Sequence, residues 1–110
     1  MEKDSTVYLR LMLDATRKIH SFIVGMNEQA FLEDSKTQSA VIMQLQVIGE
    51  LSKKIPDSIK VHIDVPWKDI AGLRDVVSHD YFSLDLKAVW QTATHDVVEL
   101  EGKIDEYFGA

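Results

Sequence analysis

The residue types best suited to chemistry lie together in one short stretch, Arg74-Asp75-Val76-Val77-Ser78-His79-Asp80-Tyr81. Cleavage of RNA without a metal needs a base for the ribose 2′-OH, an acid for the leaving 5′-oxygen, and a cation beside the charge that develops on phosphorus. His79 can supply the acid or the base, and Arg74 can supply the cation. The stretch therefore holds the side chains that metal-independent RNA cleavage requires.

The spacing of these two residues constrains how they can work together. Five positions along a regular helix place Arg74 and His79 roughly 140° apart around the axis and about 7.5 Å along it. One regular helix cannot aim both side chains at one phosphate, so either the helix unwinds before His79 or two copies of the chain face each other across a two-fold axis. We therefore expect a homodimer with the motif helix and the last helix near the axis.

Three further residues are candidates for a supporting role, namely Asp75, Ser78 and Glu50. Asp75 lies four residues before His79 and can accept a hydrogen bond from one ring nitrogen, which would fix the tautomer. Glu50 falls late in an apolar helical stretch, where it is either a buried partner for Arg74 or an exposed residue, and we favour the buried partner. An arginine and a histidine at this spacing also occur on plain salt-bridging surfaces, so residue types alone do not decide the function.

The remaining histidines do not predict a metal site. His20, His62 and His95 lie in separate segments without the helical-turn spacing to other ligands that would define a closed site. The chain has no cysteine, which excludes disulfides, thiolate metal sites and a cysteine nucleophile. We expect neither a metal nor a cofactor.

Four apolar stripes at helical spacing predict the elements that position the motif. Sustained strand-type alternation does not occur, so the expected fold is all-α, an antiparallel four-helix bundle. Gly49 stands inside the second helix, where close packing against another helix would explain it. The expected helices run from caps at Asp4, Ser5 or Thr6 to Gly25, from Asp34 or Ser35 to Pro56, from Pro66 to a fading end near His79, and from Ser83 or Asp85 to Phe108.

The connections are expected to be short. Residues 26–34 are polar and mixed, which favours a connection with one helical turn. A loop containing Ile59 and Ile63 joins the second helix to the third. Trp67 and Trp90 lie on apolar helical faces and are expected to be core residues rather than platforms for nucleic-acid bases.

Length and charge limit the class of protein. The 110 residues fit a single domain over 1–110, with 45% hydrophobic and 27% charged residues. The net charge of −6 argues against a surface that coats nucleic acid, so any contact with RNA should be local. The start of the chain is polar and no apolar run approaches the roughly 20 residues that span a bilayer. We expect a cytoplasmic protein without membrane contact.

The sequence resembles the HEPN superfamily and in particular the HepT-like toxins. Their pattern Arg-x4-His-x-Tyr is matched by Arg74, His79 and Tyr81, and the resemblance extends from about Tyr8 to Phe108. Asp75 stands where asparagine is frequent in that family, and Ser78 stands where a bulkier apolar residue is usual. Further matching stretches are Val47-Ile48-Gly49-Glu50, Val65-Pro66-Trp67-Lys68-Asp69-Ile70, His79-Asp80-Tyr81-Phe82 and Val89-Trp90.

This resemblance implies a homodimer whose paired motifs form a cleft for metal-independent RNA cleavage. It also implies the toxin of a type II or type VII-like toxin–antitoxin system, whose antitoxin is a minimal nucleotidyltransferase. By the same resemblance Tyr81 is the residue that accepts AMP from that antitoxin, which silences the cleft.

An alternative from a different functional class remains open. A catalytically inert HEPN dimer could act as a scaffold or nucleotide-binding partner of a nucleotidyltransferase. The acidic balance of the chain and Asp75 favour this alternative, whereas the intact Arg74, His79 and Tyr81 favour the ribonuclease.

Overall fold

The computed structural model describes residues 5–75 and 85–109, and Asp75 by its backbone alone. Within these ranges every regular element is helical and no strand occurs, which confirms the all-α class. None of the helices described there is long and apolar enough to cross a membrane. The predictions for Ser78, His79 and Tyr81 fall outside the described residues.

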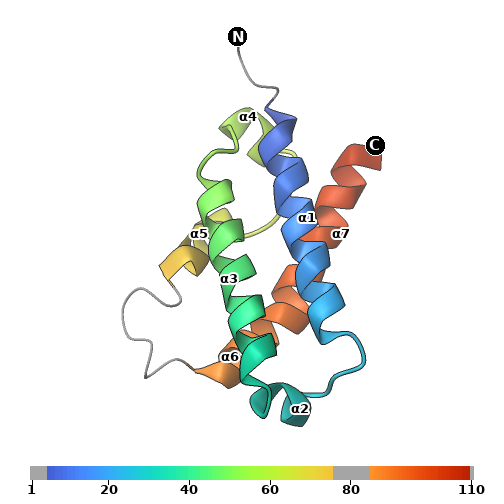
Figure 1. Ribbon diagram of the computed structural model, residues 1–110. Coiled ribbons are helices and arrows are strands. Elements are labelled where there is room, and N and C mark those ends of the chain that lie inside the picture. Colours follow the sequence, from blue (N-terminus) through green and yellow to red (C-terminus); the bar gives the residue numbers. More distant parts are fainter. Residues whose placement is uncertain (1–4, 76–84, 110) are drawn as a thin grey trace.

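Two helices of equal length form the centre of the molecule, α1 (Thr6–Ile23) and α3 (Ser35–Ser52), which lie side by side (Figure 1). The first ends where Gly25 adopts a φ of 80°, a conformation that glycine takes without steric cost. The second begins at Asp34, whose carboxylate accepts a hydrogen bond from the Thr37 backbone N–H at 3.0 Å. Both boundaries agree with the sequence prediction, whereas α3 ends at Ser52, short of the predicted end at Pro56.

The last helical segment consists of three parts, α6 (Leu86–Gln91), a π-helical turn η3 (Thr92–Asp96) and α7 (Val97–Gly109). Asp85 caps its start, because its carboxylate accepts hydrogen bonds from the backbone N–H groups of Lys87 and Ala88. The sequence predicted a single helix of this extent but did not predict the π turn. Within that turn the Thr94 hydroxyl donates to the Trp90 carbonyl at 2.8 Å, a bond that often bends helices.

Shorter helices fill the connections. The expected single turn within residues 26–34 is α2 (Glu28–Leu32). The predicted loop after the second helix contains a further short helix, α4 (Asp57–Lys60), because Ile59 and Ile63 are both buried and hold the segment against the core.

The predicted motif helix is short in the described part of the chain. Helix α5 (Trp67–Gly72) follows Pro66, and a 3₁₀ turn, η1 (Leu73–Asp75), continues it. The Trp67 indole N–H donates to the carbonyls of Lys60 and Ile63, which fastens the start of α5 to the segment before it. Both elements pack against α3.

A single core lies between α1, α3 and the last helical segment. The Phe31 ring is fully buried and lies 5.2 Å from the Trp90 ring, centroid to centroid. Trp67 and Trp90 were predicted as core residues; they pack against the core but are only partly buried. The largest fully buried side chains are Phe31, Leu9, Met12, Ile19, Leu45, Ile48, Ile63, Ile104 and Val41, with Thr16 and Ser52 as the polar members.

Candidate functional site

Arg74 lies on η1 with its backbone directly against α3. The closest part of α3 is Gly49, where an added Cβ would stand far inside van der Waals contact with the Arg74 backbone nitrogen and 3.0 Å from its Cα. The sequence prediction that Gly49 serves close packing is therefore confirmed. The helix that packs there is the one that carries the motif arginine.

The Arg74 side chain forms an ion pair with Glu50, the residue that follows Gly49. Its Nη1 lies 3.5 Å from Glu50 Oε1, and the two side chains are 42% and 57% exposed. The predicted partnership is right, but the predicted burial of Glu50 is wrong. Successive residues of a helix point about 100° apart, so the turn that aims Gly49 at the Arg74 backbone directs Glu50 toward solvent.

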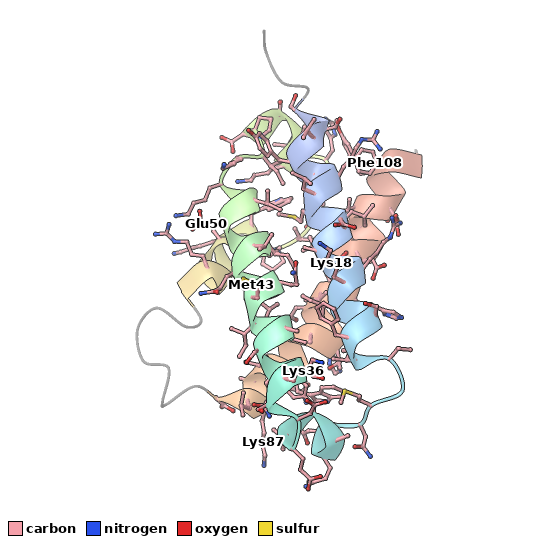
Figure 2. All side chains as sticks on the ribbon, in the orientation of Figure 1. Lys18, Lys36, Met43, Glu50, Lys87 and Phe108 are labelled. Carbon is pink, nitrogen blue, oxygen red and sulfur yellow. The ribbon has the colours of Figure 1, made fainter. Side chains whose placement is uncertain are left out.

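The flank of α3 beside this ion pair carries one exposed and two partly buried apolar side chains, of which Figure 2 labels Met43. Met43 is 58% exposed, and Val47 and Leu51 follow it at intervals of four residues. Val47 and Leu51 also line a shallow hollow together with Gln46, Glu50 and Lys54. We call Met43, Val47 and Leu51 the α3 strip.

The sequence prediction missed the α3 strip as a surface. The buried positions of α3 are Val41, Ile42, Leu45, Ile48, Gly49 and Ser52, and Val47 is only partly buried. The signal was available, because Met43, Val47 and Leu51 form a second apolar row at helical spacing.

The other predicted site residues divide into two groups. Asp75 is the last residue of η1. Ser78, His79 and Tyr81 lie outside the described residues, so the joint action of Arg74 and His79 on one phosphate stays a prediction. In the described part of the chain, the residue of the Arg-x4-His-x-Tyr pattern whose surroundings are known is Arg74.

The three remaining histidines lie on separate elements. His20 is on α1, His62 follows α4, and His95 is in η3 with its Nδ1 at 2.9 Å from the Thr94 hydroxyl. Across residues 5–75 and 85–109, no group of three or more His, Cys, Asp or Glu side chains is arranged to hold a metal ion.

A second hollow lies away from the motif sequence. Its lining residues are His62, Ile63, Asp64, Lys103, Glu106 and Tyr107. These side chains carry charges of both signs, and none belongs to the stretch predicted to do chemistry. The hollow gives no indication of a particular ligand.

Comparison with known proteins covers most of the chain. The family described as HepT-like, "Ribonuclease HepT-like", matches residues 12–107. "Probable ribonuclease HepT" of Thermococcus cleftensis is 37% identical over 107 residues, which cover 96% of this chain and 97% of that protein. "Putative RNase MJ0127" of Methanocaldococcus jannaschii is 37% identical over 113 residues, covering 98% and 93%. "Putative RNase TTE0752" of Caldanaerobacter subterraneus is 32% identical over 100 residues, covering 90% and 89%. No solved structure gave a significant match.

Proposed function

Because the chain belongs to the HepT-like ribonuclease family, we propose that it is a metal-independent endoribonuclease and the toxin of a type II or type VII-like toxin–antitoxin pair. Arg74 and His79 are its catalytic residues. The observation that carries the proposal is the setting of Arg74, whose backbone lies against Gly49 while its guanidinium group stays partly exposed. A phosphate can reach a cation held in this way.

The proposed reaction is an internal transfer within the RNA. His79 takes the proton from a ribose 2′-OH, and the 2′-oxygen attacks the neighbouring phosphorus. The bond to the 5′-oxygen breaks, and that oxygen leaves with a proton from an acid, which leaves a 2′,3′-cyclic phosphate. Arg74 stabilises the negative charge on the phosphorane oxygens during this step.

Glu50 is the supporting residue whose contact is described. Its carboxylate lies 3.5 Å from Arg74 Nη1, longer than the 2.7–2.9 Å typical of strong charge-assisted bonds. A half-exposed pair of this kind stabilises the protein by about 0–1 kcal/mol. Replacing this contact by one to an RNA phosphate therefore costs the fold little.

The proposed assembly is a homodimer of HEPN-type four-helix bundles. In each copy α1, α3, the α5–η1 segment and the α6–η3–α7 segment act as the four helices. The α3 strip supports a contact between copies, because it is apolar, is exposed at Met43 and partly exposed at Val47 and Leu51, and is continuous with the Arg74–Glu50 pair. This adds α3 to the motif helix and the last helix as surfaces near the axis.

Light scattering at micromolar concentration tests the assembly. The wild type should have the mass of a dimer, and Met43→Glu should shift it toward the monomer. Val24→Glu is the matched control, because Val24 is also an exposed apolar residue but follows α1, on another element than the strip. A monomeric wild type would contradict the proposed dimer.

Regulation is proposed to act through Tyr81. Transfer of AMP to its hydroxyl by the cognate minimal nucleotidyltransferase would add a phosphodiester charge and a bulky base near the cleft. Co-expression with that enzyme should raise the mass of the chain by one or more AMP units on the peptide that contains Tyr81. Tyr81→Phe should stay toxic and escape silencing. Full neutralisation of Tyr81→Phe would show that the antitoxin acts by binding instead.

The test of the activity uses purified wild type, Arg74→Ala and His79→Ala on single-stranded RNA. The wild type should cleave in the presence of EDTA and leave 2′,3′-cyclic ends, while both variants should lose most of this activity and remain folded. Loss of wild-type activity in EDTA would point to a metal mechanism.

A second candidate function is the inert HEPN dimer that serves as a scaffold or nucleotide-binding partner of a nucleotidyltransferase. The carboxylate of Glu50 beside Arg74 and the net charge of −6 favour it, because both oppose RNA binding. A protein that binds the nucleotidyltransferase but leaves RNA intact, and whose induction causes no growth arrest, would support this candidate.

A further inference from the structure

Building on the proposed function, we infer that Gly49 is a positioning residue for Arg74. The missing side chain at residue 49 lets the 3₁₀ turn η1 lie directly on α3, and this contact sets where the guanidinium group is presented. Gly49 does not touch the substrate in this arrangement. It acts through the backbone of Arg74.

The first support is the nature of the obstruction. An added Cβ at residue 49 would meet the nitrogen, the Cα and the Cβ of Arg74, the last two at 3.0 Å. These are backbone and near-backbone atoms, which cannot swing aside as the end of a long side chain can. A methyl group at residue 49 must therefore push the two segments apart.

The second support is that α3 has little freedom to yield. Ile48 and Ser52, on either side of Gly49 in the helix, are both fully buried. The Ser52 hydroxyl also donates to the Gly49 carbonyl at 2.7 Å, a buried bond within α3. The η1 turn has three residues and a partly exposed arginine, so it is the part expected to move.

The third support comes from the other glycines. An added Cβ at Gly72 or Gly102 would meet nothing within 4 Å, although both residues are helical. The close approach at Gly49 is thus not shared by these helical glycines. It occurs opposite the arginine of the pattern, and it places Glu50 beside the same guanidinium group.

The experiment compares Gly49→Ala with Gly102→Ala, a glycine-to-alanine change in open space on α7. On RNA, kcat of Gly49→Ala should fall by about 10- to 100-fold, because a displacement of about 1 Å in a charge-stabilising group has effects of this size. KM should change much less. Gly102→Ala should retain the wild-type kcat, and circular dichroism should show both variants folded.

A double-mutant cycle then separates positioning from general damage. In the Arg74→Ala background, Gly49→Ala should cause no further loss of residual activity, since its effect passes through the arginine. A further loss as large as that seen in the wild-type background would overturn the inference. An unfolded Gly49→Ala chain would also overturn it, because Gly49 would then be required for core packing.

A readout without RNA keeps this inference separate from the proposed function. The side-chain N–H signal of Arg74 in the nitrogen–proton NMR spectrum can be assigned by its loss in Arg74→Ala. It should shift in Gly49→Ala and stay in place in Gly102→Ala. If the wild type fails to cleave RNA, the proposed function is wrong, and the inference is then tested by the NMR signal of Arg74 alone. If wild type cleaves and Gly49→Ala matches it, the inference fails and the proposed function stands.

Discussion

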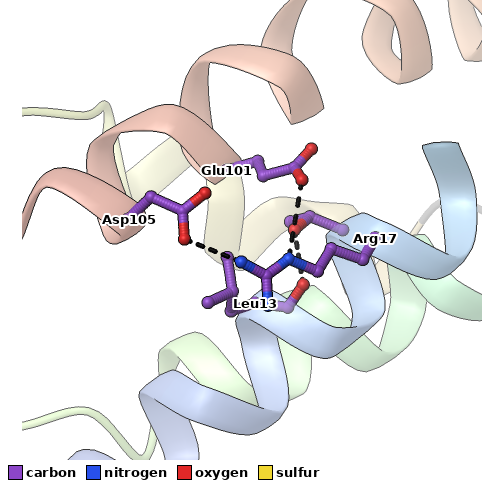
Figure 3. Close-up of polar contacts among 5 residues, drawn as sticks. Leu13, Arg17, Glu101 and Asp105 are labelled. Atoms are coloured by element: carbon purple, nitrogen blue, oxygen red, sulfur yellow. Dashed lines mark hydrogen bonds and ion pairs between the residues drawn. The ribbon is translucent and has the colours of Figure 1, made fainter. Parts of the chain in front are cut away.

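Two surface arginines are held in different ways. Arg17 on α1 reaches α7, where its Nη2 lies 2.8 Å from Asp105 Oδ1 and its Nε lies 3.8 Å from Glu101 Oε2 (Figure 3). Arg74 on η1 lies 3.5 Å from Glu50 on α3. The first arginine links two long helices through a close contact. The second has its backbone against Gly49, and its described contact with a carboxylate is longer.

The difference teaches which arginine suits a ligand. A guanidinium group that already lies at 2.8 Å from one carboxylate and near a second gains little from a phosphate, because the phosphate would have to displace both. A longer ion pair is easier to exchange. Exposure alone would not separate the two, since Arg17 is 57% exposed and Arg74 is 42% exposed.

The largest expected effect is on activity. Arg74→Ala should lower RNA cleavage by about 10²–10³-fold, the usual cost of losing one charge-stabilising donor. Arg17→Ala should leave cleavage unchanged, which makes it the matched control. Arg74→Lys should recover little, because lysine lacks the planar two-pronged contact. The activity is measured as the initial rate on the same RNA. Equal losses of activity in Arg17→Ala and Arg74→Ala would show that the two arginines do not differ in function.

The next effect compares the buried core with the α3 strip. Phe31→Ala should lower the free energy of unfolding by about 3–5 kcal/mol, because it empties a fully buried site against Trp90. Met43→Ala, on the exposed α3 strip, should change it by about 0.5 kcal/mol or less within one chain. Urea denaturation measures both. A large loss in Met43→Ala that depends on protein concentration would indicate that the strip is covered in a dimer.

A smaller effect separates the two ion pairs directly. Arg17→Ala should lower the free energy of unfolding by about 0.5–1 kcal/mol, and Arg74→Ala by less, because exposed pairs contribute little and the Arg74 contact is longer. High salt should reduce the difference. If urea denaturation shows Arg74→Ala to be the more destabilising change, Arg74 serves the fold more than we propose.

The smallest expected effect is the pH dependence of stability that comes from Asp34. The pKa of Asp34 is lowered from its ordinary value of 3.8, chiefly by the hydrogen bond from the Thr37 backbone N–H and next by the Thr37 hydroxyl. Because the pKa of Asp34 is lower in the folded protein, its ionised carboxylate stabilises the fold fully above pH 3.8. This stabilisation is lost as the pH falls through the pKa of the folded state. Asp34→Asn, which keeps a capping side chain but does not titrate, should lose less thermal stability than wild type over that interval. Identical acid profiles would contradict this assignment.

Much of the fold could be predicted because the signals were local. Asp34 and Asp85 cap helices through residues two or three positions along the chain, and Gly25 ends a helix through its own φ angle. Apolar periodicity placed the long helices. Family membership followed in the same way, from the spacing of Arg74, His79 and Tyr81 and the matching stretches around them.

The sequence by itself determined the helical class, the end of α1, the start of α3 and the residues of the motif, because each depends on neighbours along the chain. The tertiary structure decided that Gly49 faces the backbone of Arg74 and that Glu50 points to solvent beside it. It also decided that Met43 is exposed while Leu45 is buried. These outcomes depend on how η1 and α1 are rotated against α3, and periodicity within one helix does not specify that rotation.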